Sequence, residues 1–435
     1  MKKILVITYY WPPAGGPGVQ RILKFAKYLP EFGYKPIILT VKNGDYPAND
    51  YSLMKEIPDK IKVVKTKVLE PYNLYRKILG KKPETKIPVA ILAQKKNLSK
   101  KEILMHWIRK NIFIPDARIA WNYHGFLKAQ EIIRKDKIEM VLISSPPHSI
   151  QLIGYRLKKK FDLPLICDFR DPWTDIHYYE NLNRLSLSKK IDQMFEKKVI
   201  DCCDRLITVS PALKRYFLKK NKESNCSVIY NGYDKSDFQE VKNKIKSERF
   251  LVSYIGNFKD NQNIESIWQA IAELITTHNK FAKDFRLKLT GRVNNDVIDS
   301  IKKFNLFEFT EIEGYVSHKE AINRMCAAAV LLFIIPRSEK NEGILTGKIF
   351  DYLASETPFL SIGNPHGDAE KLLKKTNAGP MFDYNQKNKI KDRLLNLYNS
   401  WEKGKLDKFK PVHDRVIKYN RKSLTRKLAA ILDEI

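Results

Sequence analysis

The chain has 435 residues, of which 43% are hydrophobic, so it is too long for one ordinary domain and too apolar to be disordered as a whole. We expect two domains of roughly 200 residues each. Lys and Arg number 79 against 49 Asp and Glu, a net charge of +30, which favours phosphates, nucleic acid or anionic lipid as partners. The five cysteines form no Cys-x-x-Cys pair, which argues against a disulfide framework or zinc site and suits a reducing cytoplasm.

Two apolar runs resemble export or membrane signals but are better explained as buried strands. Residues 1–10 form a run that is too short for a signal peptide, lacks a small-residue cleavage site and leads into glycines. The run at residues 327–335 ends at Pro336 and falls short of the ~20 residues that a spanning helix needs. We therefore expect a cytoplasmic chain, either soluble or peripheral on the inner face of the membrane.

Short apolar runs alternate with amphipathic stretches through the first half of the chain, which is the pattern of parallel α/β units. Strands are predicted at residues 4–8, 36–41, 61–68, 140–144, 164–168, 205–209 and 227–230. Helices are predicted at residues 19–32, 119–135, 149–161, 188–202 and 212–220.

The segment 72–117 interrupts this alternation with many lysines and bulky apolar residues. Within it, residues 100–113 are predicted to be helical, with apolar side chains such as Trp107 next to Lys and Arg. Such a helix suits the surface of an anionic membrane, and it equally suits packing over the edge of the domain. The sequence leaves both interpretations open.

The second half repeats the alternation, with strands predicted at residues 250–255, 286–290, 309–313, 330–335 and 359–362. A helix at residues 264–277 carries a 3.6-residue apolar stripe, and residues 412–435 are predicted to be one more amphipathic helix. The polar, aperiodic segment 237–249 is the best linker candidate. We therefore predict an N-terminal domain at 1–245, a C-terminal domain at 246–410, and a final helix at 411–435 that returns toward the N-terminal domain.

Between the first predicted strand and helix lies a glycine-rich turn, residues 15–18, which includes Gly16 and Gly18. Glycines in this position let backbone N–H groups approach a phosphate, although a tight turn needs glycine for its geometry alone. The spacing is not Gly-x-Gly-x-x-Gly, which disfavours a dinucleotide redox site. The turn therefore predicts contact with a phosphate-bearing ligand of another kind.

Two further clusters follow predicted strands: residues 144–148 (Ser-Ser-Pro-Pro-His) and residues 168–173 (Asp-Phe-Arg-Asp-Pro-Trp). Strand C-termini of a parallel sheet meet at one edge, so His148, Arg170 and Asp171 are expected to gather there. These side chains can hydrogen-bond sugar hydroxyls and place charge near a phosphate. The structural alternatives are a packed His148 and an ion pair between Arg170 and a neighbouring carboxylate.

These motifs, together with residues 230–234 (Tyr-Asn-Gly-Tyr-Asp), 254–257 (Tyr-Ile-Gly-Asn), 289–292 (Leu-Thr-Gly-Arg) and 347–354 (Gly-Lys-Ile-Phe-Asp-Tyr-Leu-Ala), give the chain a family likeness. It resembles family 4 glycosyltransferases of bacterial cell-surface polysaccharide synthesis along nearly its whole length. The resemblance implies the GT-B fold, an α/β architecture of two Rossmann-like parallel-sheet domains that face a central cleft. It also implies retaining transfer from a nucleotide-sugar to a saccharide or lipid-linked saccharide, with no metal or other cofactor.

The resemblance assigns the nucleotide to the second domain and the acceptor to the first. Asp351 takes the place of the family glutamate that binds the ribose hydroxyls, and Lys348 would reach the pyrophosphate. Gly256, Asn257 and Arg292 complete the donor-binding set, to which the glycine turn of the first domain also belongs.

The catalytic set implied by the resemblance is His148, Arg170, Asp171 and Glu342. This chain departs from the family pattern at three places. Eight residues, rather than seven, separate Glu342 from Asp351; Asn257 and Asn263 stand near positions where many relatives keep Arg and Lys; and Arg170 stands where some relatives carry a histidine. The missing positive charges could be supplied by Lys348, Arg292 or Arg337, and the sequence does not choose among them.

Two other functions fit parts of the sequence. A nucleotide-sugar epimerase would share the two-domain fold, but it would need more clustered carboxylates and histidines. A nucleic-acid-binding protein would suit the charge of +30, but no aromatic–basic, zinc-finger or helix-turn-helix motif supports it, so no nucleic-acid partner is expected. The expected partners are a nucleotide-sugar donor, the saccharide acceptor and an anionic inner membrane surface.

Overall fold

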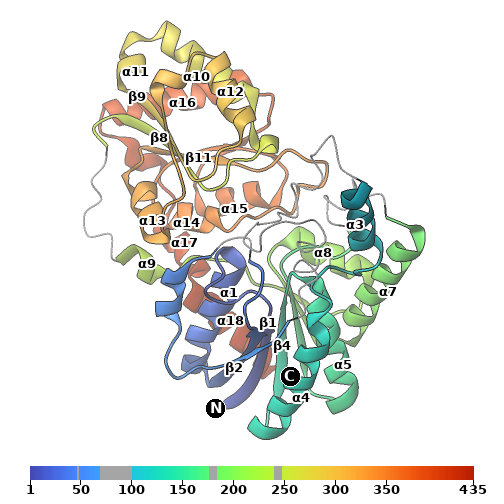
Figure 1. Cartoon of the computed structure of the whole chain (residues 1–435). Coiled ribbons are helices and arrows are strands. Elements are labelled where there is room, and N and C mark those ends of the chain that lie inside the picture. The colour runs from blue at the N-terminus through green and yellow to red at the C-terminus, as the bar shows by residue number, and fades with distance from the viewer. Residues whose placement is uncertain (47–48, 69–99, 176–183, 240–246) are drawn as a thin grey trace. The chain divides into compact units, whose positions relative to one another are not determined.

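The computed structural model describes residues 1–46, 49–68, 100–175, 184–239 and 247–435. The chain divides into two compact units, which are Met1–Tyr230 with Thr425–Ile435, and Asn231–Leu424. Each unit is built on its own fully parallel sheet, covered by helices (Figure 1). The mixture of two parallel sheets and many helices confirms the predicted α/β class.

The first unit contains a seven-stranded sheet in the order β3-β2-β1-β4-β5-β6-β7. Its strands are β1 (Lys2–Thr8), β2 (Tyr34–Val41), β3 (Lys62–Thr66), β4 (Met140–Ser145), β5 (Leu165–Phe169), β6 (Arg205–Thr208) and β7 (Cys226–Val228). Its principal helices are α1 (Pro17–Tyr28), α3 (Lys100–Asn111), α4 (Trp121–Asp136), α5 (Gln151–Phe161), α7 (Ser186–Cys202), α8 (Pro211–Lys220) and most of α18 (Arg421–Asp433).

The strand order reverses between β1 and β4: the chain runs from β1 outward to β2 and β3 on one side, and from β4 outward to β5, β6 and β7 on the other. In Figure 1, α1 and α18 lie on one side of the first sheet and α4 and α5 on the other. Ligands of open parallel sheets bind outside the carboxyl ends of the strands at such a reversal. The glycine turn that follows β1 therefore lies where the topology favours a ligand.

The second unit contains a six-stranded sheet in the order β10-β9-β8-β11-β12-β13, which reverses between β8 and β11. Its strands are β8 (Phe250–Ile255), β9 (Phe285–Thr290), β10 (Thr310–Glu313), β11 (Val330–Ile334), β12 (Phe359–Ile362) and β13 (Met381–Phe382). Its helices are α9 (Lys235–Gln239), α10 (Glu265–Thr277), α11 (Asn279–Asp284), α12 (Asn295–Lys303), α13 (His318–Ala327), α14 (Lys348–Ala354), α15 (Asp368–Thr376), α16 (Lys387–Glu402) and α17 (His413–Val416). Short 3-10 turns complete both units.

Every predicted strand is present, with ends shifted by at most two residues. The sequence missed β13, because two residues are too short for any alternation to be read. The stripe of α10 is buried as predicted: Ile267, Ile271 and Leu274 are at most 1% exposed. The predicted segment 72–117 lies partly outside the described residues, but its helix is present as α3.

The single helix predicted at 412–435 is wrong, because the structure breaks it into α17, a 3-10 turn and α18. Asn420 causes the break: its backbone is extended, and its side-chain Oδ1 accepts a hydrogen bond from the backbone N–H of Lys422, 2.8 Å away. This is the geometry of a helix N-cap, which starts a new helix rather than continuing the old one.

The division at Tyr230–Asn231 lies earlier than the boundary predicted near 245. The residues after Tyr230 belong with the second unit because Tyr233 forms an isolated parallel bridge with Asn420, and Oδ2 of Asp237 lies 3.1 Å from Nε2 of His318. The final residues belong with the first unit, where Asp433 accepts a hydrogen bond from the hydroxyl of Tyr34 at 2.5 Å.

Candidate active site

In the first unit, the register of the sheet brings three strand ends together. Thr8 of β1 pairs with Ser144 of β4, and Ser144 pairs with Asp168 of β5. The segments that follow these residues carry the glycine turn and the two polar clusters. The strand ends that carry these segments therefore lie at one edge of the sheet, as predicted.

Asp168 holds this edge together from inside. Its carboxylate accepts hydrogen bonds from the Ser144 hydroxyl at 2.7 Å and from two nitrogens of Arg21 at 3.0 and 2.8 Å. Arg21, on α1, also donates to the carbonyls of Ile229 and Tyr230. Both charged side chains are at most 1% exposed, so this ion pair fastens α1 to β5 and to the end of β7.

Arg170 has different partners, because Asp168 is occupied by Arg21. The Arg170 side chain donates to the carbonyl of Ser145 at 3.1 Å and to that of Pro146 at 2.9 Å. A Cβ on Gly18 would lie 1.5 Å from Nη1 of Arg170, so only glycine leaves room for the guanidinium at the start of α1. Burial lowers the pKa of Arg170, and the carboxylates of Asp168 and Asp171 oppose that effect.

His148 is packed into the protein. Its ring stacks on Trp173 with centroids 5.4 Å apart and on Phe169 at 6.0 Å, and the residue is 3% exposed. Burial, assisted by the charge of Arg170, lowers the pKa of His148 to about 3, so its imidazole is neutral at pH 7. Asp171 is exposed, and Gly16 is also exposed with a positive φ of 111°. Any catalytic role of His148 must therefore be carried out by a neutral ring.

In the second unit, two glycines make the turns after β8 and β9. Gly256 and Gly291 both have positive φ, 122° and 116°. A Cβ on Gly291 would lie 2.5 Å from the carbonyl oxygen of Gly256, and one on Gly256 would lie 3.0 Å from Nζ of Lys348. The backbones therefore approach each other and the lysine closely, which only glycine permits at these two positions.

Lys348, the first residue of α14, lies over the ring of Tyr254 with Nζ 4.1 Å from the ring centroid. Nζ also donates a hydrogen bond to the Tyr254 hydroxyl at 2.8 Å, and that hydroxyl in turn lies 2.9 Å from the carbonyl oxygen of Asn257. Burial first, and the charge of Lys259 second, lower the pKa of Lys348 to about 7. The amine is thus held in place by Tyr254, and it loses its proton more readily than an exposed lysine does.

The other predicted site residues of the second unit differ in exposure. Asp351 lies one helical turn after Lys348 and is half-buried, while Asn257 and Arg292 are exposed. Glu342 is 53% exposed in its side chain, with an oxygen 4.0 Å from Nζ of Lys371. The structure thus brings Gly256, Gly291 and Lys348 together.

Sequence reasoning missed two contributors to this site. Tyr254 was noted only as part of a motif, although it supports Lys348 directly, and Lys259 was not considered. Lys259 follows Gly256 by three residues, so a basic residue just after the turn was a signal that could have been used. Asn263, which was compared with the family's basic positions, instead donates to the carbonyl of Asp296 and to the hydroxyl of Ser300.

Comparison with known families decides what class of protein this is. The model of Glycosyltransferase Family 4 matches residues 18–237, half of the chain. The chain belongs to glycosyltransferase family 4. It is therefore an enzyme that transfers sugars, as the resemblance predicted. No curated protein matches the chain in a sequence search.

Several solved structures share this architecture at low sequence identity. Sucrose-phosphate synthase from Thermosynechococcus elongatus is similar with a TM-score of 0.64 and 14% identity, over 100% of this chain and 99% of that one. HepE from Anabaena, in complex with UDP-glucose, gives 0.61 and 12%, over 100% of both chains. WaaG, a glycosyltransferase involved in lipopolysaccharide biosynthesis, gives 0.54 and 13%, over 98% and 99%. At these identities the likeness establishes the GT-B fold of this glycosyltransferase.

Proposed function

We propose that this glycosyltransferase is a retaining, metal-independent enzyme that moves a sugar from a nucleotide-sugar donor to a saccharide or lipid-linked saccharide in cell-surface glycan synthesis. The observation that carries the proposal is Lys348, held on Tyr254 beside the close-packed turns of Gly256 and Gly291. A buried amine that can gain a proton near neutral pH suits a leaving diphosphate, whose charge grows during transfer. The nucleotide-sugar bound to HepE and the glycan role of WaaG support the same assignment.

In this proposal the second unit binds the donor. Lys348 contacts the diphosphate as a point charge, and Asp351 accepts hydrogen bonds from the ribose hydroxyls with its two carboxylate oxygens. Arg292 and Asn257 are exposed beside the same turns and would contact the phosphates or the base. Glu342, whose side chain is exposed, would contact the sugar.

The first unit supplies the acceptor side, which includes an oriented cation. Arg170 is fixed by carbonyls with its Nη1 at Gly18, so the guanidinium is oriented before any ligand binds. Asp171 is exposed and suits a hydroxyl of the acceptor, and the backbone at Gly16 suits a phosphate oxygen. Neutral His148 serves this arrangement by packing beneath the cluster. Lys348 of the second unit would carry the charge of the leaving group without a metal ion.

Calorimetric titration tests the donor assignment. Wild type is titrated with UDP, GDP, ADP, CMP and dTDP in the presence of EDTA, alongside Asp351→Ala and the control Asp299→Ala, an exposed carboxylate of α12. We expect one nucleotide to bind selectively, and Asp351→Ala to weaken it about tenfold while Asp299→Ala does not. Absence of binding by every nucleotide would contradict the donor assignment and favour the nucleic-acid alternative.

Retention and metal independence need a second experiment with the matching nucleotide-sugar. Proton NMR of the transferred sugar should show the same anomeric configuration as the donor. The rate in EDTA should equal the rate with added Mg²⁺ or Mn²⁺. An inverted product would contradict the retaining mechanism, and a rate restored only by metal would contradict metal independence.

We also propose that the enzyme attaches peripherally to an anionic inner membrane surface. None of the described helices has the length and apolar character needed to cross a bilayer. Helix α3, however, exposes Ile103 (54%), Leu104 (57%) and Trp107 (46%), and it belongs to a chain of net charge +30. Exposed apolar groups on a basic protein are the combination that inserts into the interface of anionic bilayers.

Vesicle flotation tests this attachment. Wild type should float with phosphatidylglycerol-containing vesicles at low salt and remain in solution with pure phosphatidylcholine. Leu104→Ser with Trp107→Ser should reduce flotation about tenfold, because each removes apolar area from the interface. Equal recovery of wild type and variant, or no flotation of wild type, would contradict the attachment.

A further inference from the structure

The buried residues in the first three turns of helix α7 are polar: Ser188, Asp192 and Glu196. The side chains of Asp192 and Glu196 are each 1% exposed, while Leu187 is 67% exposed and Met194 43%. Burying a carboxylate costs desolvation free energy, and well-packed apolar side chains in the same places are often at least as stabilising. The two acids therefore call for an explanation other than stability alone.

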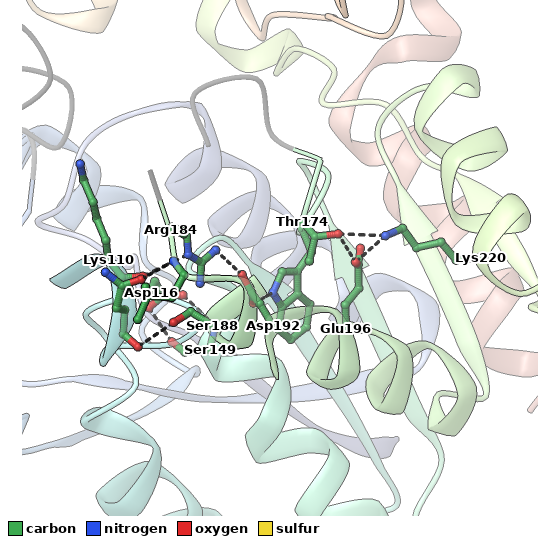
Figure 2. Close-up of polar contacts among 12 residues, drawn as sticks. Lys110, Asp116, Ser149, Thr174, Arg184, Ser188, Asp192, Glu196 and Lys220 are labelled. Atoms are coloured by element: carbon green, nitrogen blue, oxygen red, sulfur yellow. Dashed lines mark hydrogen bonds and ion pairs between the residues drawn. The ribbon is translucent and has the colours of Figure 1, made fainter. Parts of the chain in front are cut away.

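Asp192 contacts both ends of the connection from β5 to α7 (Figure 2). Its Oδ1 accepts a hydrogen bond from the indole N–H of Trp173, and its Oδ2 accepts one from Nη1 of Arg184, both at 2.7 Å. Arg184 also donates to the backbone carbonyl of Lys110 at the end of α3. One buried carboxylate thus ties the residues that follow β5 to the residues that precede α7.

Glu196, one turn further along α7, holds the next residue of the same connection (Figure 2). Its Oε2 accepts from the hydroxyl of Thr174 at 2.6 Å and from Nζ of Lys220 at 2.6 Å. Its Oε1 accepts from the hydroxyl of Tyr216, also at 2.6 Å. Lys220 donates to the Thr174 hydroxyl as well, at 2.9 Å, so these groups form a closed set of charge-assisted bonds.

The held residues come directly after the proposed site residues in the chain. Trp173 follows Arg170 by three positions, and its ring is clamped between the Asp192 carboxylate at its edge and the His148 ring at its face. At the other end of the same stretch, the backbone N–H of Arg170 donates to the carbonyl of Ser145 at 3.1 Å. Residues 170–174 are therefore fixed at their start by the strand β4 and at their end by helix α7.

We propose that Asp192 and Glu196 are positioning residues, which set the place of Arg170 and Asp171 for sugar transfer without touching substrate. The inference rests on the proposed function of those two residues. A carboxylate suits the task because it accepts two directed hydrogen bonds at once, whereas an apolar side chain would fill the space without defining the register of the turn.

Kinetics of Asp192→Asn and Glu196→Gln, near-isosteric variants that remove the charge, test the proposal. The substrate is UDP-glucose, GDP-mannose or ADP-glucose, chosen by the base that calorimetry selects, and nucleoside diphosphate release is measured. We expect kcat to fall about 10- to 100-fold, because a small misplacement of a reacting group costs that much, while the donor KM stays within about twofold. Trp173→Phe should lower kcat similarly, and combining it with Asp192→Asn should add little, since both remove the same hydrogen bond.

Asp204→Asn is the matched control, because Asp204 accepts a hydrogen bond from the backbone N–H of Leu165 at 2.7 Å, at the opposite end of β5. Its kcat should equal that of wild type. A kcat unchanged in Asp192→Asn and Glu196→Gln, or lowered equally in Asp204→Asn, would overturn the positioning role. If Asp192→Asn fails to fold, Trp173→Phe alone decides by the same criterion. A wild type that releases no nucleotide from any donor would overturn the proposed function itself.

Discussion

Donor affinity should fall as the pH rises from 7 to 8.5, because Lys348 loses its proton in that range. Burial places the pKa of Lys348 at about 7 in the free enzyme. A bound diphosphate stabilises the charged amine and raises that pKa, so binding above pH 7 takes up a proton. Raising the pH therefore removes the protonated form of the enzyme, which is the form that binds the donor.

The size of the effect follows from the charged fraction of Lys348. With a pKa of about 7, that fraction is about one half at pH 7 and about 3% at pH 8.5, so affinity should fall roughly 15-fold if only the charged form binds. Calorimetry with a nucleotide-sugar is the assay of choice, since its diphosphate carries no proton that titrates in this range. Measurements at constant ionic strength keep the screening of the charges constant.

Two variants separate Lys348 from other causes of a pH effect. Lys348→Arg keeps a positive charge throughout, so its affinity should change little between pH 7 and 8.5. Lys259→Ala removes a neighbouring positive charge, so the pKa of Lys348 should rise and the fall in affinity should begin at higher pH. A wild-type affinity that is constant over this range, or an equal fall in Lys348→Arg, would refute the reasoning.

Three substitutions test the rest of the framework. Gly18→Ala places a methyl group 1.5 Å from the present position of Arg170 Nη1, so transfer should fall at least about tenfold while calorimetric nucleotide binding persists; normal turnover would contradict the placement of Arg170. In urea denaturation, Gly291→Ala should lower the free energy of unfolding by about 1–3 kcal/mol, because Gly291 has a positive φ and its new Cβ would lie 2.5 Å from the carbonyl oxygen of Gly256. Gly314→Ala is the control and should leave that free energy unchanged, since a Cβ there would meet no atom within 4 Å. Arg21→Met leaves a buried carboxylate unpaired and should cost about 3–5 kcal/mol by the same measurement; a loss below about 1 kcal/mol would show that the ion pair is dispensable.

The predicted site was recovered unevenly from the sequence. The sequence predicts that Gly18 and Gly256 form turns after strands. The structure shows that each also makes room for a cation, which is Arg170 at Gly18 and Lys348 at Gly256. The sequence did not show that Arg170 bonds to backbone carbonyls rather than to Asp168. Asp168 is already paired with Arg21, which is far away in the sequence and becomes its neighbour only through the packing of α1 on β5.

The sequence by itself determined the fold class, every described strand except β13, and the family. Buried parallel strands need continuous apolar runs with turn residues at their ends, and such local signals survive in any tertiary context. The helix 188–202 was likewise recognised from its own residues.

Only the tertiary structure decided which face of that helix is buried and why. The outward Leu187 and the inward Asp192 run against its amphipathic pattern, because the donors that satisfy the carboxylate, Trp173 and Arg184, come from the connection that precedes the helix. In the same way, the low pKa of Lys348 arises from burial against Tyr254, which lies 94 residues away in the chain. Partners brought together by packing set charge states and orientations, and no local pattern of residues encodes them.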